Sequence, residues 1–292
     1  MISASLIKDL REKTNAGMLD CKKALEATDG NIDAAIDWLR KKGVKTAAKK
    51  ADRIAAEGLA AIKIDGNIAA IVEVNSETDF VAKNSEFTSL VDSILNAIIG
   101  NDVKTVEELL NVSYENGTIN DLIVSKTATI GEKISLRRFE RIEKSDNESF
   151  GDYIHMGGRI AVLTVVDGAS SEVAKDVSMH SAAMRPQFVK SSDVPTETLE
   201  NEMQIIKEQL LKQGKPEKII DEKIMPGKVD AYYEEVCLEN QIFVKGDGES
   251  VAQFVKNNGG SIVTMIRYEV GEGIEKKKEN FAEEVAKQIQ GK

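Results

Sequence analysis

The strongest constraint on the fold is a pattern of strand, glycine turn, strand and helix that occurs twice in the chain. The first copy comprises strands at 59–64 and 68–74, the turn Asp65-Gly66-Asn67, and a helix at 85–99. The second comprises strands at 150–155 and 159–166, the turn Met156-Gly157-Gly158, and a helix at 172–184 before Pro186. Glycine turns between β-branched runs are typical of hairpins. The repetition therefore predicts a duplicated α+β core.

Short amphipathic helices precede this core. Apolar residues recur at helical spacing in three sets: Leu6, Ile7 and Leu10; Met18, Cys21 and Leu25; Ile32, Ala35, Ile36 and Leu39. Asn31 is a good N-cap for the third helix, and Lys41-Lys42-Gly43 is a typical helix end. The sequence predicts a three-helix bundle, followed by an Ala- and Lys-rich linker at 44–56 that is either helical or flexible.

A helical hairpin is predicted inside the second copy, at about 197–236. Leu199, Met203, Ile206 and Leu210 form an apolar seam, and Pro226 should interrupt the second helix. The seam packs either against the body or against a second subunit. Ser261–Val270 is expected to complete the second sheet, and a final amphipathic helix carries Phe281, Val285 and Ile289.

The charge distribution disfavours a general nucleic-acid binder. The formal net charge is −10, whereas such proteins need a basic surface. Residues 1–53 hold 12 Lys/Arg against 8 Asp/Glu, and the remainder holds 27 against 41. A basic head (residues 1–54) on an acidic body suggests contact with an acidic surface. Ordinary solvated helix faces explain so small a charge equally well.

No constellation of residues predicts an enzyme or a cofactor. Cys21, Cys237, His155 and His180 lack zinc-site spacing, and no phosphate-binding loop is present. Cys21 is expected to be a core thiol, although Lys22 and Lys23 follow it. His155, at a predicted strand end, reads as a polar surface or interface residue rather than a general base. No apolar run approaches ~20 residues, so no membrane span or leader is predicted and a cytoplasmic location is expected.

One stretch, Asn75–Asn84, lies where the strand at 68–74 gives way to a helix. Two interpretations of its centre, Thr78-Asp79-Phe80, are open. In the local one, Thr78 or Asp79 caps the helix by accepting backbone N–H bonds, and Phe80 packs as a hydrophobic staple. In the functional one, this corner presents side chains to a partner from a rigid base.

Several motifs spread along the chain together resemble those of one known family. They are Asn75–Lys83 with its Thr-Asp-Phe-Val, Leu10–Leu25, Ile130-Gly131-Glu132, His155–Leu163, Met179-His180 with Pro186-Gln187-Phe188, and Arg267–Gly273. Through them the chain resembles the bacterial elongation factor Ts family along nearly its whole length. Departures are modest: Ser76-Glu77 stands where the family often has Cys-Gln, and Pro226 falls inside a helix.

The resemblance implies a fold and a function. The fold would be a ubiquitin-associated-like head and linker at 1–54, core subdomains at 55–140 and 141–270 with the hairpin inserted, and a helical module at 271–292. The function would be guanine-nucleotide exchange on elongation factor Tu, in its GDP-bound and nucleotide-free forms, without covalent chemistry, direct nucleic-acid binding or membrane contact. A non-exchanging scaffold that uses its head as a binding module is the alternative.

The resemblance also implies residue roles. Phe80 would wedge into the partner near its Mg²⁺ site, and Asp79 would disturb the groups that hold the ion, with Thr78 and Val81 completing the motif. Partner-binding residues would be Met18, Leu19, Ile130, Gly131, Glu132 and His155. The hairpin is a possible homodimer contact.

Overall fold

The computed structural model describes residues 2–14 and 16–275. The chain divides into two compact units. Unit 1 comprises the described parts of Met1–Ala61, Val72–Glu140 and Glu269–Lys292; unit 2 comprises Ile62–Ile71 and Arg141–Tyr268. No helix among the described residues has both the length and the apolar character needed to cross a membrane.

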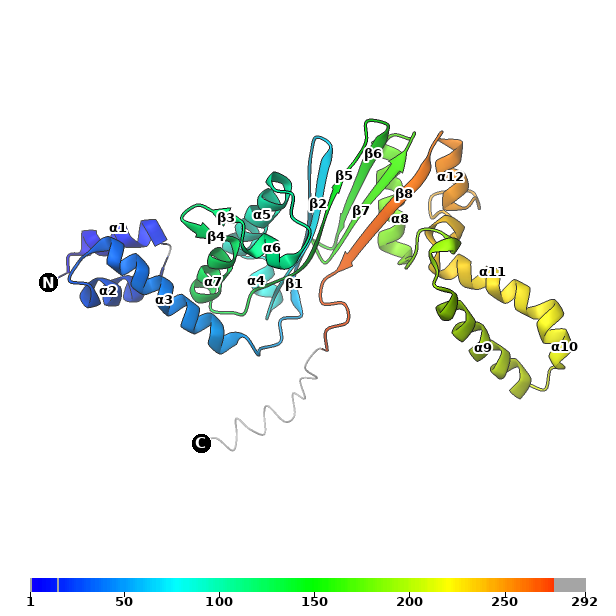
Figure 1. Cartoon of the computed structure of the whole chain (residues 1–292), viewed down its shortest axis with the longest axis horizontal. Helices are drawn as coiled ribbons and strands as arrows, with labels where there is room; N and C mark the ends of the chain where they lie inside the picture. The colour runs from blue at the N-terminus through cyan, green and yellow to red at the C-terminus, as the bar shows by residue number, and fades with distance from the viewer. Residues whose placement is uncertain (1, 15, 276–292) are drawn as a thin grey trace. The chain divides into compact units, whose positions relative to one another are not determined.

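Unit 1 begins with the predicted three-helix head: α1 (Ala4–Thr14), α2 (Met18–Ala27) and α3 (Ile32–Lys50) (Figure 1). Its small core contains Leu10, Cys21, Ala24, Leu25 and Ala35, all fully buried. The Asn31 side chain accepts a hydrogen bond from the Ala34 N–H at 3.0 Å, which confirms the predicted N-cap. These apolar faces are just large enough to hold three short helices together.

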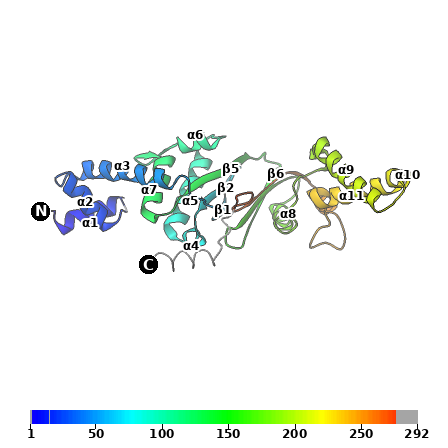
Figure 2. The same ribbon diagram turned by 90° about the horizontal axis from the view of Figure 1, so that it is seen from below.

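The predicted end of the third helix at Lys41-Lys42-Gly43 is wrong, because α3 continues to Lys50. Gly43 is buried against α7 (Ile119–Ile130), and the two helices lie side by side in Figures 1 and 2. A Cβ added at Gly43 would lie 3.7 Å from Cβ of Ala128. Gly43 therefore lies within the contact between α3 and α7 and does not end the helix, and the linker predicted at 44–56 is helical up to Lys50.

The first sheet has the strand order β1 (Glu57–Asp65), β2 (Ile68–Ser76), β5 (Ser135–Glu143). Its central strand β2 is almost entirely buried. Two helices follow β2: the short α4 (Asp79–Ala82) and α5 (Ser85–Gly100), whose apolar face is buried as predicted. α6 (Val106–Leu110) and the two-residue strands β3 (Ser113–Tyr114) and β4 (Gly117–Thr118) then lead into α7; the sequence did not predict this small ribbon.

Unit 2 repeats this topology. Its sheet has the order β6 (Glu148–His155), β7 (Ile160–Asp167), β8 (Ser261–Glu269), so the second hairpin strand is again central. α8 (Ser171–Met184) packs on β6 and β7. It approaches so closely that a Cβ at Gly151 would lie 2.1 Å from the Ala174 carbonyl carbon. The predicted mixed α+β class, with N-terminal helices before a sheet-containing core, is confirmed.

The predicted hairpin consists of α9 (Thr196–Lys212), α10 (Glu217–Ile219) and α11 (Met225–Val236), with a π-helical turn, η2 (Ile220–Ile224), between the last two. Pro226 has no N–H and its ring disfavours a regular preceding turn. The π turn, which ends two residues before it, confirms the expected interruption. Leu210 and Ile220 are buried, whereas Ile205 is 43% exposed.

Short elements complete unit 2. They are η1 (Ser191–Asp193), η3 (Leu238–Asn240) and α12 (Val251–Asn257). Val251 and Val255 of α12 join the core of the unit. The amphipathic helix predicted around Phe281, Val285 and Ile289 lies outside the described residues.

Candidate partner-binding site

The corner between β2 and α4 exposes its aromatic side chain. Phe80 is 80% exposed, so the interpretation of Phe80 as a hydrophobic staple is wrong. Thr78 occupies the N-cap position of α4 but makes no capping bond; its hydroxyl donates to Oε1 of Glu132 at 2.7 Å. The local interpretation therefore fails for Thr78 as well. Val81, which follows Phe80, is half-buried.

Asp79 lies beside Phe80 as an exposed carboxylate. Lys83 Nζ donates to its Oδ2 at 2.9 Å, one helical turn away. This bond is the main reason that the pKa of Asp79 lies below its ordinary value. The carboxylate is therefore ionised at neutral pH, and a surface pair of this kind is easily exchanged for a stronger partner. The corner thus presents an aromatic ring and a negative charge together.

The predicted Ile130-Gly131-Glu132 segment lies against this corner. α7 ends at Ile130, and Gly131 adopts a left-handed conformation at φ 88°, which turns the chain. Glu132 follows Gly131, and its Oε2 accepts the N–H groups of Glu77 at 3.1 Å and of Thr78 at 3.0 Å. Ile130 is half-buried and Gly131 is exposed. The structure thus joins two predicted groups of site residues that are more than 50 positions apart.

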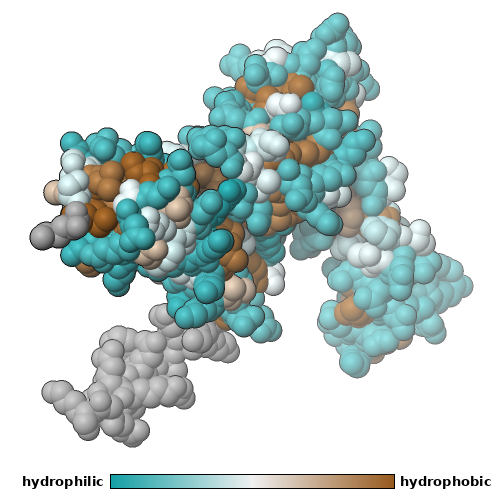
Figure 3. All heavy atoms as spheres, turned by 60° about the vertical axis from the view of Figure 1, so that its left-hand side comes forward, coloured by the Kyte–Doolittle hydropathy of each residue, from teal (hydrophilic) through white to brown (hydrophobic). Residues whose placement is uncertain are grey.

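The head presents two apolar side chains at the start of α2. Met18 is 58% exposed and Leu19 is 73% exposed. The sequence grouped Met18 with Cys21 and Leu25, but only Cys21 and Leu25 are buried in the core of the head, and Met18 is the exposed first residue of α2. Figure 3, in which the N-terminal helices come forward, shows apolar patches between hydrophilic side chains on this part of the surface. Burial raises the pKa of the Cys21 thiol, so the neighbouring lysines do not activate it and the prediction of a core thiol is confirmed.

His155 lies in unit 2, at the end of β6, as predicted. Its ring is exposed and stacks on Tyr153 with 6.0 Å between ring centroids. The adjacent Ile154 and Met156 are 42% and 69% exposed. This strand end therefore forms a second exposed surface of mixed apolar and imidazole character, separate in sequence from the corner at Phe80.

The other histidine, His180, is part of the structure of unit 2. It is fully buried on α8, and burial holds its pKa below the ordinary value despite a bond to Gln241. Nε2 lies 3.0 Å from Gln241 Oε1, and Nδ1 accepts the Val244 N–H at 3.3 Å. The neutral ring therefore ties α8 to the segment after η3. Nowhere among residues 2–14 and 16–275 do three or more His, Cys, Asp or Glu side chains form a group that could hold a metal ion.

Comparison with known families identifies the chain. The model of the family described as Elongation factor TS matches residues 77–272, more than half of the 292 residues. The chain belongs to the elongation factor Ts family. A second model, the UBA/TS-N domain, matches residues 20–39 within the head. Membership of the elongation factor Ts family implies a role in nucleotide exchange on elongation factor Tu.

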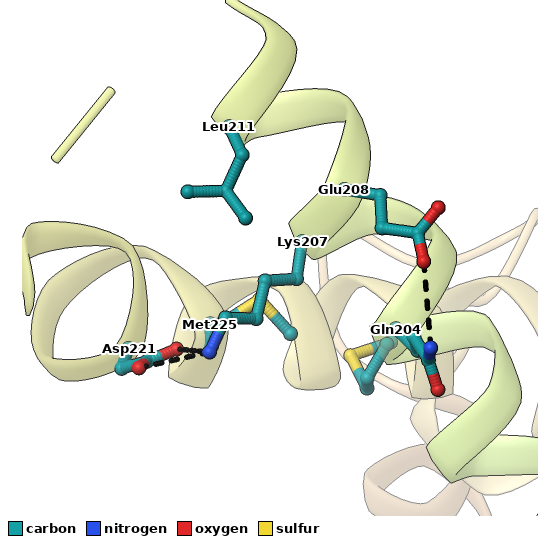
Figure 4. A pocket seen from close by; sticks show the side chains of 7 residues that line it. Gln204, Lys207, Glu208, Leu211, Asp221 and Met225 are labelled. Atoms are coloured by element: carbon teal, nitrogen blue, oxygen red, sulfur yellow. Dashed lines mark hydrogen bonds and ion pairs between the residues drawn. The ribbon is translucent and has the colours of Figure 1, made fainter. Parts of the chain in front are cut away.

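Within this family member, sequence reasoning missed two features of the surface. One is the set of residues that bond to Glu77, namely Arg53, Glu132 and Lys133, whose spacing follows no local pattern. The other is a groove of about 460 Å³ on the hairpin, lined by Met203, Gln204, Lys207, Glu208, Leu211, Asp221 and Met225. Figure 4 shows Lys207 reaching across to Asp221, with Nζ 2.9 Å from Oδ1. The apolar seam of α9 gave a partial signal for this groove.

Proposed function

We propose that this chain accelerates GDP release from elongation factor Tu by inserting Phe80 near the Mg²⁺ site and by setting Asp79 against the groups that hold the ion and phosphate. The observation that carries the proposal is the 80% exposed Phe80 ring beside an ionised carboxylate. Mg²⁺ requires near-ideal octahedral geometry, so a small displacement of its ligands weakens its binding. A factor that favours the nucleotide-free form must, by reciprocity, weaken nucleotide binding.

The size of the effect requires more than one contact. A ~10⁴-fold faster release needs roughly 5.5 kcal/mol off the barrier. Burial of one phenylalanine yields about 2–3 kcal/mol. Met18 and Leu19 on the head and the surface at His155 supply further exposed apolar area. We assign these residues the role of holding the partner while Phe80 and Asp79 act on its nucleotide site.

The experiment measures release of fluorescent GDP from elongation factor Tu at increasing concentrations of the chain. Phe80→Ala should lower the maximal release rate more than it weakens the complex with nucleotide-free elongation factor Tu. Val263→Ala is a matched control, since Val263 is a 45% exposed apolar residue on β8. Equal losses of rate and affinity in Phe80→Ala would contradict the wedge. Absence of any acceleration by the unaltered chain would reject exchange and favour the scaffold alternative.

Two finer expectations belong to this proposal. The chain should bind both GDP-bound and nucleotide-free elongation factor Tu in the cytoplasm, where elongation takes place. A homodimer through the hairpin is supported by exposed apolar residues there, with Ile205, Leu211 and Ile219 each more than 40% exposed. Sedimentation of the full chain and of a form without the hairpin tests the dimer. If both forms sediment as monomers, the dimer is rejected.

A further inference from the structure

We infer that Glu132 is a positioning residue for the exchange reaction, which fixes the corner that carries Phe80 and does not bind the partner through its carboxylate. This inference rests on the proposed function of Phe80. Its first support is the hydrogen bonding of the carboxylate itself. Oε2 accepts the N–H groups of Glu77 and Thr78, and Oε1 accepts the Thr78 hydroxyl at 2.7 Å. Three donors already satisfy a half-buried carboxylate.

The bonds of Glu132 fall at the point where the chain leaves the sheet. β2 ends at Ser76, and α4 begins at Asp79. The N–H groups of Glu77 and Thr78 thus lie between the two elements, where regular secondary structure supplies no partners for them. The Glu132 carboxylate supplies those partners. The Ser76 hydroxyl also donates to the Thr78 carbonyl at 2.9 Å, so this short connection is held from both sides.

A second glutamate, Glu77, accepts a bond in the opposite direction. We call the hydrogen bonds between the segment at 77–78 and the segment at 132–133 the brace. Glu77 Oε1 accepts the N–H of Lys133 at 2.6 Å, so each of the two segments donates backbone N–H groups to a glutamate of the other. Arg53 Nη1 lies 3.2 Å and 3.3 Å from the two Glu77 oxygens. Arg53 therefore supplies a cation to the Glu77 carboxylate.

The brace extends to the C-terminal end of the head. Lys133 Nζ donates to the carbonyls of Ala51 at 2.6 Å and Arg53 at 2.9 Å, and Lys50 Nζ donates to the Gly131 carbonyl. Three segments distant in sequence are thereby tied together: the turn after α3, the corner after β2, and the residues after α7. The corner is thus held by the same cluster that anchors the C-terminal end of α3.

Phe80 depends on this support because its own ring makes little contact with the chain. With 80% of the residue exposed, packing does not fix the ring, and its placement follows from the backbone two residues earlier. Displacement of a positioned group by about 1 Å can cost on the order of 10²-fold in rate. Loss of the Glu132 bonds should therefore lower the maximal rate of GDP release by roughly tenfold to a hundredfold.

The test is a double-mutant cycle in the GDP-release assay with the full chain. Glu132→Ala should lower the maximal release rate. In a background that carries both Asp79→Ala and Phe80→Ala it should have little further effect, because Glu132 acts through these two side chains of the corner. A glutamate that bound the partner independently would lower the rate by the same factor in both backgrounds, which would overturn the inference. Glu140→Ala, at an exposed glutamate on β5 of the same unit, is the matched control and should leave the rate unchanged.

A second measurement does not depend on the partner. Hydrogen–deuterium exchange of the free chain should accelerate at the Glu77 and Thr78 amides in Glu132→Ala, with a smaller change in Glu132→Gln, which keeps one acceptor oxygen. Unchanged exchange at both amides would overturn the brace even if activity fell. If Phe80→Ala itself leaves GDP release unaffected, the proposed function fails. If Phe80→Ala slows release and Glu132→Ala does not, only the positioning role fails.

Discussion

A buried charge cluster in unit 1 gives the sharpest stability prediction. Glu73 of β2 is fully buried and accepts hydrogen bonds from Arg137 Nη1 at 2.9 Å and Arg138 Nε at 2.7 Å. Asn75 Nδ2 at 3.1 Å and the Gly271 N–H at 2.9 Å add to these. Burial alone would raise the pKa of Glu73, but these four donors outweigh it and hold the pKa below the ordinary value. The cluster therefore stabilises the ionised carboxylate.

The substitution Glu73→Gln removes the charge and nearly keeps the volume. Removal of one partner from a buried ion pair costs roughly 3–5 kcal/mol. The two arginine side chains retain 27% and 31% exposure, so water compensates them in part. We expect a loss near the lower end, about 3 kcal/mol of unfolding free energy. That is a large fraction of the roughly 5–15 kcal/mol typical of a folded domain.

The pH dependence of this loss distinguishes the charge from the shape of the side chain. Because the folded pKa lies below the unfolded value of roughly 4.3, the stabilisation is complete above that value and disappears as the pH falls through the folded pKa. Urea unfolding followed by the fluorescence of Trp38, the only tryptophan, should show the full difference between Glu73→Gln and the unaltered chain at pH 7. The difference should shrink toward pH 3. An equal difference at both pH values, or one below about 1 kcal/mol at pH 7, would refute the reasoning.

Two glycines that pack against helices should respond in opposite ways to a methyl group. Gly43→Ala should stabilise unit 1 by about 0.5–1 kcal/mol in urea unfolding, because alanine favours helix and its Cβ would meet Ala128 and Val124 at 3.7 Å and 3.8 Å, ordinary contact distances. Destabilisation would show that α3 and α7 pack more tightly than these two distances imply. Gly151→Ala should instead cost more than about 3 kcal/mol in unit 2, because its Cβ would meet the Ala174 backbone at 2.1 Å. A thermal midpoint unchanged in Gly151→Ala would contradict this close approach of α8 to β6.

The sequence predicted the parts of the fold that depend on local pattern. Both copies of strand, turn, strand and helix were found, since alternation and helical periodicity are properties of neighbouring residues. The end of α3 was placed too early because Lys41-Lys42-Gly43 has the composition of a helix end. The reason for continuation is α7, about 80 positions later, and no local signal reports it. Arg40, just before the predicted end, forms an ion pair with Asp121 of α7 at 2.8 Å.

The starts of α6 and α7 carry a local sequence signal. α6 and α7 both begin with capping boxes, at Thr105 with Glu108 and at Thr118 with Asp121. A threonine followed three residues later by an acidic residue marks a helix start. The sequence predicts helices at 105–111 and 119–133, with Gly131 as a break, which leaves a non-helical segment between them. The two-residue strands β3 and β4 occupy that gap.

The candidate site was located from the sequence, but its geometry was not. The strand-to-helix pattern placed a corner at Thr78-Asp79-Phe80, and the resemblance gave its residues a function. Whether Phe80 packs inward or points outward depends on what holds Thr78, and that group is Glu132, 54 positions away. The resemblance assigned Glu132 to partner contact, whereas its bonds within the chain support a positioning role.

Rigidity at this corner affects the energetics of the proposed wedge directly. Fixing the backbone of one residue costs about 1–2 kcal/mol, so ordering a flexible corner of three residues on binding would cost about 3–6 kcal/mol. Burial of the Phe80 ring returns only about 2–3 kcal/mol. Without the brace, insertion of Phe80 would therefore weaken the complex, because the ordering cost would exceed the gain from burial. With Glu132 and Glu77 holding the corner before the partner arrives, the ordering cost is met during folding. The free energy gained by burying the ring can then offset the cost of displacing the groups that hold Mg²⁺ and GDP.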